Sequence, residues 1–276
     1  MLSRLDQYER ALLGEVVENP RDELTLSVYA DWLLDHPDRA AQTRGEYIKL
    51  ELAHAKTADL GERKDLHWQA YDLWWNHGEG WLGPLYDAVD HFVYVRGRLC
   101  IEISEETFMD RPPEEIEDAP AWELVTDIVF RSCSLELLRF LLRLPRPPML
   151  TELDIPAQSI DADGLKELIA SGLWGGLAGL SLNGNPLGDA GATVLAEWPG
   201  LASLRRLSLD AAAIGPAGAM ALFRSPWLDE IEVLSLRRNS EDYQNGVRQS
   251  FMIRQAGPST ASHLLKSRFG RRVRLK

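Results

Sequence analysis

Apolar residues in the second half of the chain recur with a period of 27 residues. Within each copy they follow the spacing L-x-x-L-x-L, and in the first three copies another apolar residue stands five positions later. The alternation predicts a short strand whose leucines face inward. A glycine also recurs with the 27-residue period, and the apolar residues after it have helical spacing. This spacing predicts a helix on the outer side of each copy. One unit cannot bury its own leucines, so the pattern predicts stacked copies. The repeated positions are Leu150, Leu153, Ile155, Ile160, Leu177, Leu180, Leu182, Leu187, Leu204, Leu207, Leu209, Ile214, Ile231, Leu234 and Leu236.

The first eighty residues lack this repeat and show helical spacing instead. Four helices are predicted from the apolar pattern. The first ends at Asn19-Pro20, the second covers about 24–34, the third begins near Arg44, and the fourth covers about 64–75. The tryptophans at Trp74, Trp75 and Trp81 are expected to seal the join to the rest of the chain rather than to stack on a ligand.

One more position of the repeat has a defined role in the turn that follows each strand. Three residues after the last strand leucine stand Gln158, Asn185, Ala212 and Asn239 in turn. A side-chain amide there can bond backbone groups that the turn leaves unpaired. The pattern resembles the leucine-rich repeat, and its length with a helical outer segment is similar to the ribonuclease-inhibitor-like subclass. The resemblance implies a curved solenoid with parallel strands on the concave face and helices on the convex face.

The helical part carries a second motif, in which Y-A-D-W-L and a histidine are followed by a short linker and G-E-Y-I-K-L-E. The motif resembles the small repeat-companion domain of bacteria such as planctomycetes and myxobacteria. That resemblance implies a helical module ahead of leucine-rich repeats, and it implies no particular activity. The matching positions are Asp22, Tyr29, Ala30, Asp31, Trp32, Leu33, His36, Gly45, Glu46, Tyr47, Ile48, Lys49, Leu50 and Glu51.

Together these patterns predict an α/β fold in which a small N-terminal helical domain precedes a short leucine-rich-repeat solenoid. We expect a helical repeat-companion domain at 1–80 and an N-terminal cap or joining segment at 81–121. The repeats are expected at 122–240, and a C-terminal cap with a basic tail at 241–276. Within that cap, residues 271–275 are expected to form a last strand.

Charge is unevenly divided along the chain, whose net charge is −12. Residues 1–120 hold 26 acidic and 12 basic side chains, whereas residues 241–276 hold 2 and 8. The overall balance makes nucleic acid an unfavourable main partner. Two cysteines exclude a disulfide scaffold and a four-thiolate zinc site. Without an apolar leader or a membrane-spanning stretch, we expect a cytoplasmic protein.

The sequence holds no recognisable catalytic motif, whether H-E-x-x-H, G-x-x-x-x-G-K-[ST] or G-x-S-x-G. We therefore predict a non-enzymatic protein–protein interaction module without a cofactor, a scaffold or regulatory subunit that is monomeric on its own. The partner, another protein, would bind the residues that flank the inward leucines on the concave face. These candidates are Asp127, Arg131, Glu152, Asp154, Ser181, Asn183, Arg206, Asp210 and Arg237.

The sequence is also compatible with two other functions. Asp31 and Asp35 share a helix face, and with His36 and Glu46 they would form a divalent-metal site of a metal-dependent enzyme or regulator. The basic tail would instead bind nucleic acid or anionic lipid, although charge on an edge strand also prevents unwanted pairing. Its basic residues are Arg271, Arg272, Arg274 and Lys276.

Overall fold

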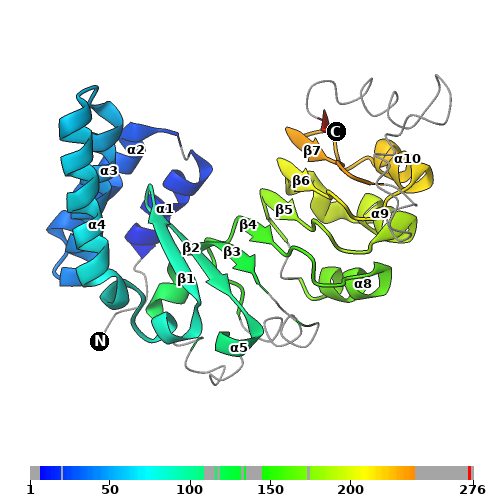
Figure 1. Cartoon of the computed structure of the whole chain (residues 1–276), viewed down its shortest axis with the longest axis horizontal. Coiled ribbons are helices and arrows are strands. Elements are labelled where there is room, and N and C mark those ends of the chain that lie inside the picture. The colour runs from blue at the N-terminus through cyan, green and yellow to red at the C-terminus, as the bar shows by residue number, and fades with distance from the viewer. Residues whose placement is uncertain are drawn as a thin grey trace. The chain divides into compact units, whose positions relative to one another are not determined.

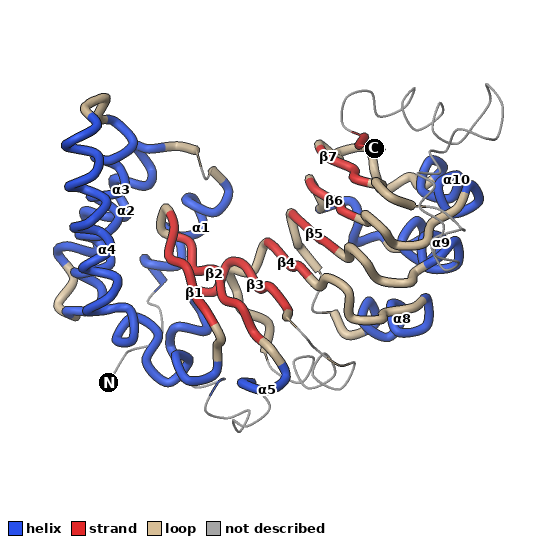
Figure 2. Tube along the Cα trace, viewed as in Figure 1, coloured by secondary structure: helices blue, strands red, loops and turns tan. Residues whose placement is uncertain are grey.

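The computed structural model shows a mixed α/β fold with a mostly parallel sheet (Figures 1 and 2). Its contacts divide the chain into two compact units: residues 1–128 with 145–150, and residues 129–144 with 151–276. We refer to them as the first and second units. No helix in the described part of the chain is both long and apolar enough to cross a membrane. The structure describes residues 7–19, 21–108, 116, 119–131, 134, 145–172, 175–239 and 273–274.

The first unit begins with a group of helices and continues into an antiparallel β-hairpin (Figure 1). Its α-helices are α1 (Gln7–Glu18), α2 (Glu23–Asp35), α3 (Arg39–Lys56), α4 (Leu60–Leu82) and α5 (Glu105–Phe108). Its 3-10 helices are η1 (Gly83–Ala88) and η2 (Pro120–Leu124). Its strands are β1 (His91–Val95), β2 (Arg98–Ile103) and most of β3 (Val125–Phe130).

Two of these helices begin earlier than the apolar pattern predicts. Asp38 caps α3 by accepting the N–H of Ala40 at 3.1 Å. Asp59 caps α4 by accepting the N–H of Glu62 at 2.8 Å. These carboxylates satisfy backbone N–H groups that a helix start leaves unpaired. The helix starts were therefore set by caps outside the apolar pattern.

Helices α2 and α3 cross closely at Gly45. A Cβ atom at this position would lie 2.9 Å from the carbonyl oxygen of Ala30 and 3.0 Å from the Cβ of Leu33. Only a residue without a side chain fits there. The hairpin turn also approaches α2, because a Cβ at Gly97 would lie 3.2 Å from Leu26, and Gly97 has a φ of +75°. Two glycines thus allow the close packing of the first unit.

The second unit repeats a strand and a helix (Figure 2). The parallel strands β4 to β7 pair with a constant offset of 27 residues, as in the pairing of Leu153 with Leu180 and of Leu207 with Leu234. The predicted register is therefore confirmed. The strands are β4 (Glu152–Asp154), β5 (Gly179–Ser181), β6 (Arg206–Ser208), β7 (Val233–Ser235) and β8 (Val273–Arg274), and the helices are α8 (Ala162–Ala170), α9 (Gly188–Glu197), η3 (Pro199–Ser203) and α10 (Pro216–Arg224).

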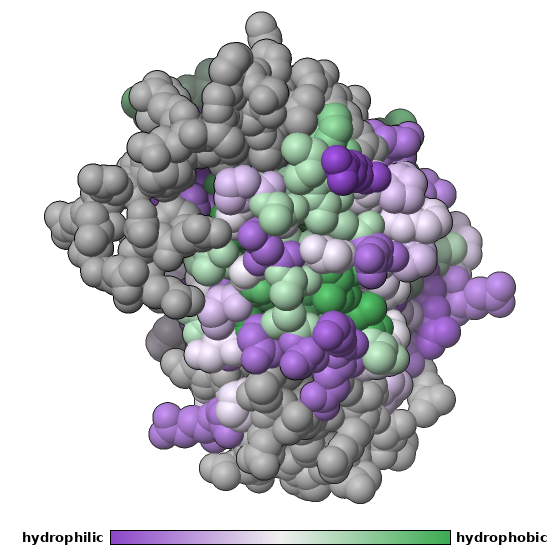
Figure 3. Space-filling view, turned by 90° about the vertical axis from the view of Figure 1, so that its right-hand side faces the viewer, coloured by the Kyte–Doolittle hydropathy of each residue, from purple (hydrophilic) through white to green (hydrophobic). Residues whose placement is uncertain are grey.

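The repeated apolar positions from Leu153 onward form the core of this unit, and all are at most 3% exposed. Strand β8 pairs with β7 in parallel, so the predicted last strand is confirmed over Val273–Arg274. Figure 3 views the molecule from the side on which α8, α9 and α10 lie. Apolar residues gather there in the centre of the described surface, with polar residues around them.

Two asparagines connect neighbouring copies of the repeat. Asn185 accepts the backbone N–H groups of Gln158 and Ile160, at 2.8 and 3.1 Å, through its Oδ1. Its Nδ2 donates to the carbonyl of Ile155 at 2.7 Å. Asn239 repeats this arrangement, accepting the N–H of Ala212 at 2.8 Å. Both side chains are buried. Besides these groups of the preceding copy, each Nδ2 also donates to a carbonyl of its own copy, Leu182 for Asn185 and Arg237 for Asn239.

The copy between them has Ala212 at the asparagine position, and another side chain joins it to its predecessor. Asp189 in α9 accepts the N–H groups of Gly215 and Gly218 at 2.8 and 2.7 Å. These groups lie at the start of α10, where Gly215 supplies no side-chain cap. A carboxylate at a helix N-terminus is favoured both as an acceptor and by the helix dipole.

We expect Asn185→Ala to lower the free energy of unfolding by about 2–4 kcal/mol, because it leaves buried backbone groups without a partner. The matched control is Gln158→Ala at the same position of the first copy, where the side chain is only half-buried. Urea unfolding followed by circular dichroism measures both. Equal losses for the two variants would contradict a bridging role for Asn185.

Candidate functional site

The predicted partner-binding residues of the second unit fall into rows that run across its parallel strands. The 27-residue register places equivalent outward positions next to one another in adjacent strands. The first row is Glu152, Gly179, Arg206 and Val233. The second is Asp154, Ser181, Ser208 and Ser235. Asn183, Asp210 and Arg237 continue at the ends of the strands with the same spacing.

In the first row Glu152 and Arg206 form an ion pair across an intervening strand. The strand between them carries Gly179, and any Cβ there would overlap the Glu152 carboxylate. The glycine therefore leaves the space through which the glutamate reaches the arginine. Two of the predicted binding residues are thus partners of each other.

At the strand ends the polar side chains form a hydrogen-bonded ladder. Asn183 accepts the hydroxyl of Ser208 at 2.8 Å and the N–H of Asp210 at 2.7 Å. Asp210 accepts the hydroxyl of Ser235 at 2.6 Å and the N–H of Arg237 at 2.7 Å. Each acceptor therefore fixes the strand of the next copy. Asn183 and Asp210 have a structural role in addition to any partner contact.

The ladder stops at Ser181. The equivalent serines, Ser208 and Ser235, each donate to the side chain 25 positions earlier in the chain. For Ser181 the residue 25 positions earlier is Pro156. Proline has no side-chain acceptor. The Ser181 hydroxyl and the Oδ1 atom of Asp154 are both shielded from solvent and have no hydrogen-bond partner. These two atoms are therefore unsatisfied polar groups at the point where the ladder ends.

The remaining predicted residues differ in their surroundings. Asp127 in β3 lies in the first unit, where its carboxylate pairs with Arg98 at 2.7 Å. Arg131 is exposed after the end of β3. In the second unit Arg237 is exposed, and its side chain makes no ion pair within the described residues.

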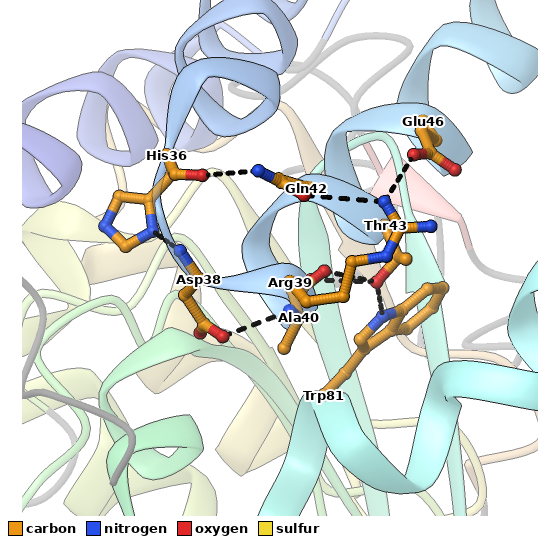
Figure 4. A network of polar contacts seen from close by, with 8 residues as sticks. All are labelled: His36, Asp38, Arg39, Ala40, Gln42, Thr43, Glu46 and Trp81. Carbon is orange, nitrogen blue, oxygen red and sulfur yellow. Dashed lines mark hydrogen bonds and ion pairs between the residues drawn. The ribbon is translucent and has the colours of Figure 1, made fainter.

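Three of the four residues of the metal-site alternative contact other groups, and Figure 4 shows two of them, His36 and Glu46. Asp31 pairs with Lys49 at 2.7 Å, and Glu46 pairs with Arg39 at 3.1 Å. His36 accepts the N–H of Asp38 at its Nδ1, at 3.1 Å. Asp35 is exposed on α2. Across the described ranges, no three His, Cys, Asp or Glu side chains are grouped so that they could hold a metal ion.

A buried ion pair lies in the core of the first unit. The Arg44 guanidinium contacts the Glu9 carboxylate at 3.2 Å, and both side chains are less than 10% exposed. The Tyr29 hydroxyl donates to the same carboxylate at 3.1 Å. Burial lowers the pKa of Arg44, but Tyr29, Tyr94 and Glu9 raise it above the usual value, so the guanidinium stays charged. Together with Tyr29, the pair joins α1, α2 and α3 at one point.

A second carboxylate holds the hairpin turn. Glu51 in α3 accepts the N–H of Arg96 at 2.8 Å, and Arg96 has a φ of +50° in the turn between β1 and β2. Burial raises the pKa of Glu51 to about 7, although the Arg96 N–H and charge both lower it. This carboxylate therefore changes its charge near neutral pH while it anchors the turn.

Of the three tryptophans expected to pack inside the protein, Trp75 differs from the prediction. Trp81 is buried and donates to the Thr43 hydroxyl at 2.8 Å (Figure 4). Trp75, expected to seal a join, is 69% exposed. Trp68 and Tyr71 are also exposed on the same helix. The helical periodicity of α4 cannot show which of its faces is covered, because that depends on where its neighbours lie.

Comparisons with known proteins provide no further assignment: no family model matches the sequence, and no curated protein gives a significant match.

We expect Glu9→Gln to lower the free energy of unfolding by about 3 kcal/mol, because it leaves Arg44 buried without its counter-charge. The double variant Glu9→Met, Arg44→Met should lose less than the two single methionine variants together, since it removes both charges. Urea unfolding of the wild type, the two single methionine variants and the double variant gives the coupling free energy between the two side chains. Additive losses would contradict a coupled buried pair.

Glu51→Gln should change how stability depends on pH. The pKa of Glu51 rises from its ordinary 4.5 to about 7 on folding, so the folded state holds an extra proton between these values. The wild type should therefore lose stability relative to the glutamine variant as the pH rises from about 5 to about 8, on the order of 2 kcal/mol. Urea unfolding at several pH values measures this difference. A difference that stays constant with pH would contradict the shifted pKa.

Proposed function

We propose that this chain is a non-enzymatic protein–protein interaction module whose binding site is the outward face of the parallel strands in the second unit. In this proposal the second unit is a short leucine-rich-repeat solenoid of the ribonuclease-inhibitor-like subclass. Residues 1–80 of the first unit are its repeat-companion domain, and residues 81–121 are the cap that joins it to the repeats. The module would act as a cytoplasmic scaffold or regulatory subunit and would be monomeric on its own.

The observation that carries the proposal is the in-register polar face. Internal hydrogen bonds and the Glu152–Arg206 pair hold many of its side chains in place before any partner arrives. Binding therefore requires little further ordering of these side chains, which lowers its entropic cost. The second row consists largely of serines, so a partner can approach the strands closely. Stacked repeats present extended surfaces of this kind.

The groups still available for a partner are at two places on this face. Asp154 is half-buried on β4, and its carboxylate forms no ion pair within the described residues. Arg237 is exposed at the other side of the ladder. An acidic and a basic side chain are thus available on this face. They favour a partner that carries a basic group opposite Asp154 and an acidic group opposite Arg237.

The test is affinity purification from cells with mass spectrometry, comparing the wild type with the double variant Asp154→Arg, Arg237→Glu. Both changes avoid Arg206, whose substitution would also break its pair with Glu152. We expect the main partner to be lost, with at least a tenfold fall in affinity when binding is measured on purified proteins.

The matched control is Glu197→Arg, Arg224→Glu, which makes the same exchange of charges at exposed positions on α9 and α10. It should retain the partner. Retention by the strand-face variant, or loss from both variants, would contradict a binding site on the strands. Thermal unfolding of all three proteins checks that the variants are folded.

A further inference from the structure

Helix α4 exposes a row of aromatic side chains in the first unit. Trp68, Tyr71 and Trp75 are 54%, 44% and 69% exposed. Their spacing of three and four residues places them on one helix face. The residues of α4 that are buried, Gly78, Trp81 and Leu82, all lie near its C-terminal end. Much of the helix therefore presents its aromatic residues to solvent.

The rings hold one another in a fixed arrangement. The Trp68 and Tyr71 centroids are 5.7 Å apart in an edge-to-face contact. Tyr71 and Trp75 are stacked with their centroids 6.2 Å apart. Tyr71 also contacts Trp74, whose ring lies 5.6 Å from that of the buried Phe92. The exposed rings are thus anchored to the core of the unit and lose little freedom when they bind.

A row of carboxylates lies beside the rings. Asp65, Asp72 and Glu79 are seven residues apart, so they follow one line along the helix. Asp65 and Asp72 lie one turn before and after Trp68, and Glu79 lies one turn after Trp75. All three residues are exposed, and within the described part of the chain no ion pair or hydrogen bond reaches their carboxylates. Lys64, one turn before Trp68, is a basic neighbour on this face.

The combination of exposed rings and unpaired carboxylates suits one chemical class of partner. An arginine side chain can stack its guanidinium on a tryptophan face and pair with a carboxylate one turn away. Phosphate groups of nucleic acids or lipids would be repelled by the same carboxylates. The rise of about 1.5 Å per residue separates the carboxylates by roughly 10 Å, which matches every third residue of an extended chain.

We propose that this face of α4 binds an extended, arginine-rich segment of another protein, with arginines at about every third position. The site consists of different residues from the strand face of the second unit, so each proposal can be tested without the other. Each arginine would lie over a ring of the row and pair with the adjacent carboxylate.

The test uses a synthetic peptide with arginine at every third position and serine and glycine between, and fluorescence anisotropy on the full chain. We expect Trp68→Ala, Trp75→Ala to weaken binding about tenfold or more. The neutral variant Asp65→Asn, Asp72→Asn, Glu79→Gln should weaken it similarly and reduce its dependence on salt. A peptide with glutamine in place of arginine should not bind.

Two matched controls separate this site from general attraction to an acidic protein. Glu15→Gln, Glu18→Gln, Asp35→Asn removes three exposed carboxylates on α1 and α2. Trp227→Ala removes an exposed tryptophan of the second unit. Both should bind the peptide as the wild type does. Equal weakening in these controls, unchanged binding by the α4 variants, or no binding by the wild type would overturn the proposal.

Discussion

The register between the short parallel strands is the constraint on which the second unit depends. A strand of three residues makes few ladder hydrogen bonds, so it is held by what its side chains meet on both faces. A slip of one residue would turn the inner leucines outward and place polar residues in the core. It would also move Asn185 and Asn239 away from the backbone groups that they satisfy. The burial of the leucines and the asparagine hydrogen bonds in the turns thus specify the same register.

The same register determines the chemistry of the outward face. Once equivalent positions lie side by side, Ser208 meets Asn183 and Ser235 meets Asp210. Where Pro156 interrupts the series, polar groups remain unpaired. From the sequence, all the outward residues look equally able to bind a partner. In the structure some of them are bonded to one another and others are free. The free positions are those at which specificity for a partner can arise.

The first unit is held together in a different way. Its helices have no common repeat, and they are fixed by a close crossing at Gly45 and by a buried pair between Glu9 and Arg44. These contacts consolidate α1, α2 and α3. Helix α4 is covered mainly near its end, which leaves its aromatic rings exposed. The two units consequently offer surfaces of different chemistry, one polar with paired charges and one aromatic with unpaired carboxylates.

The sequence by itself determined the parallel 27-residue register, the inward leucines and the helical character of the first eighty residues. These features follow from periodicity, because the side chains of one element repeat along it with the geometry of that element. Only the tertiary structure decided the pairings, such as Glu152 with Arg206, 54 residues apart, and Glu9 with Arg44. It also decided that Trp81 is buried while Trp75 is exposed. A side chain's partners and burial depend on elements distant in the chain, whose positions no local pattern contains.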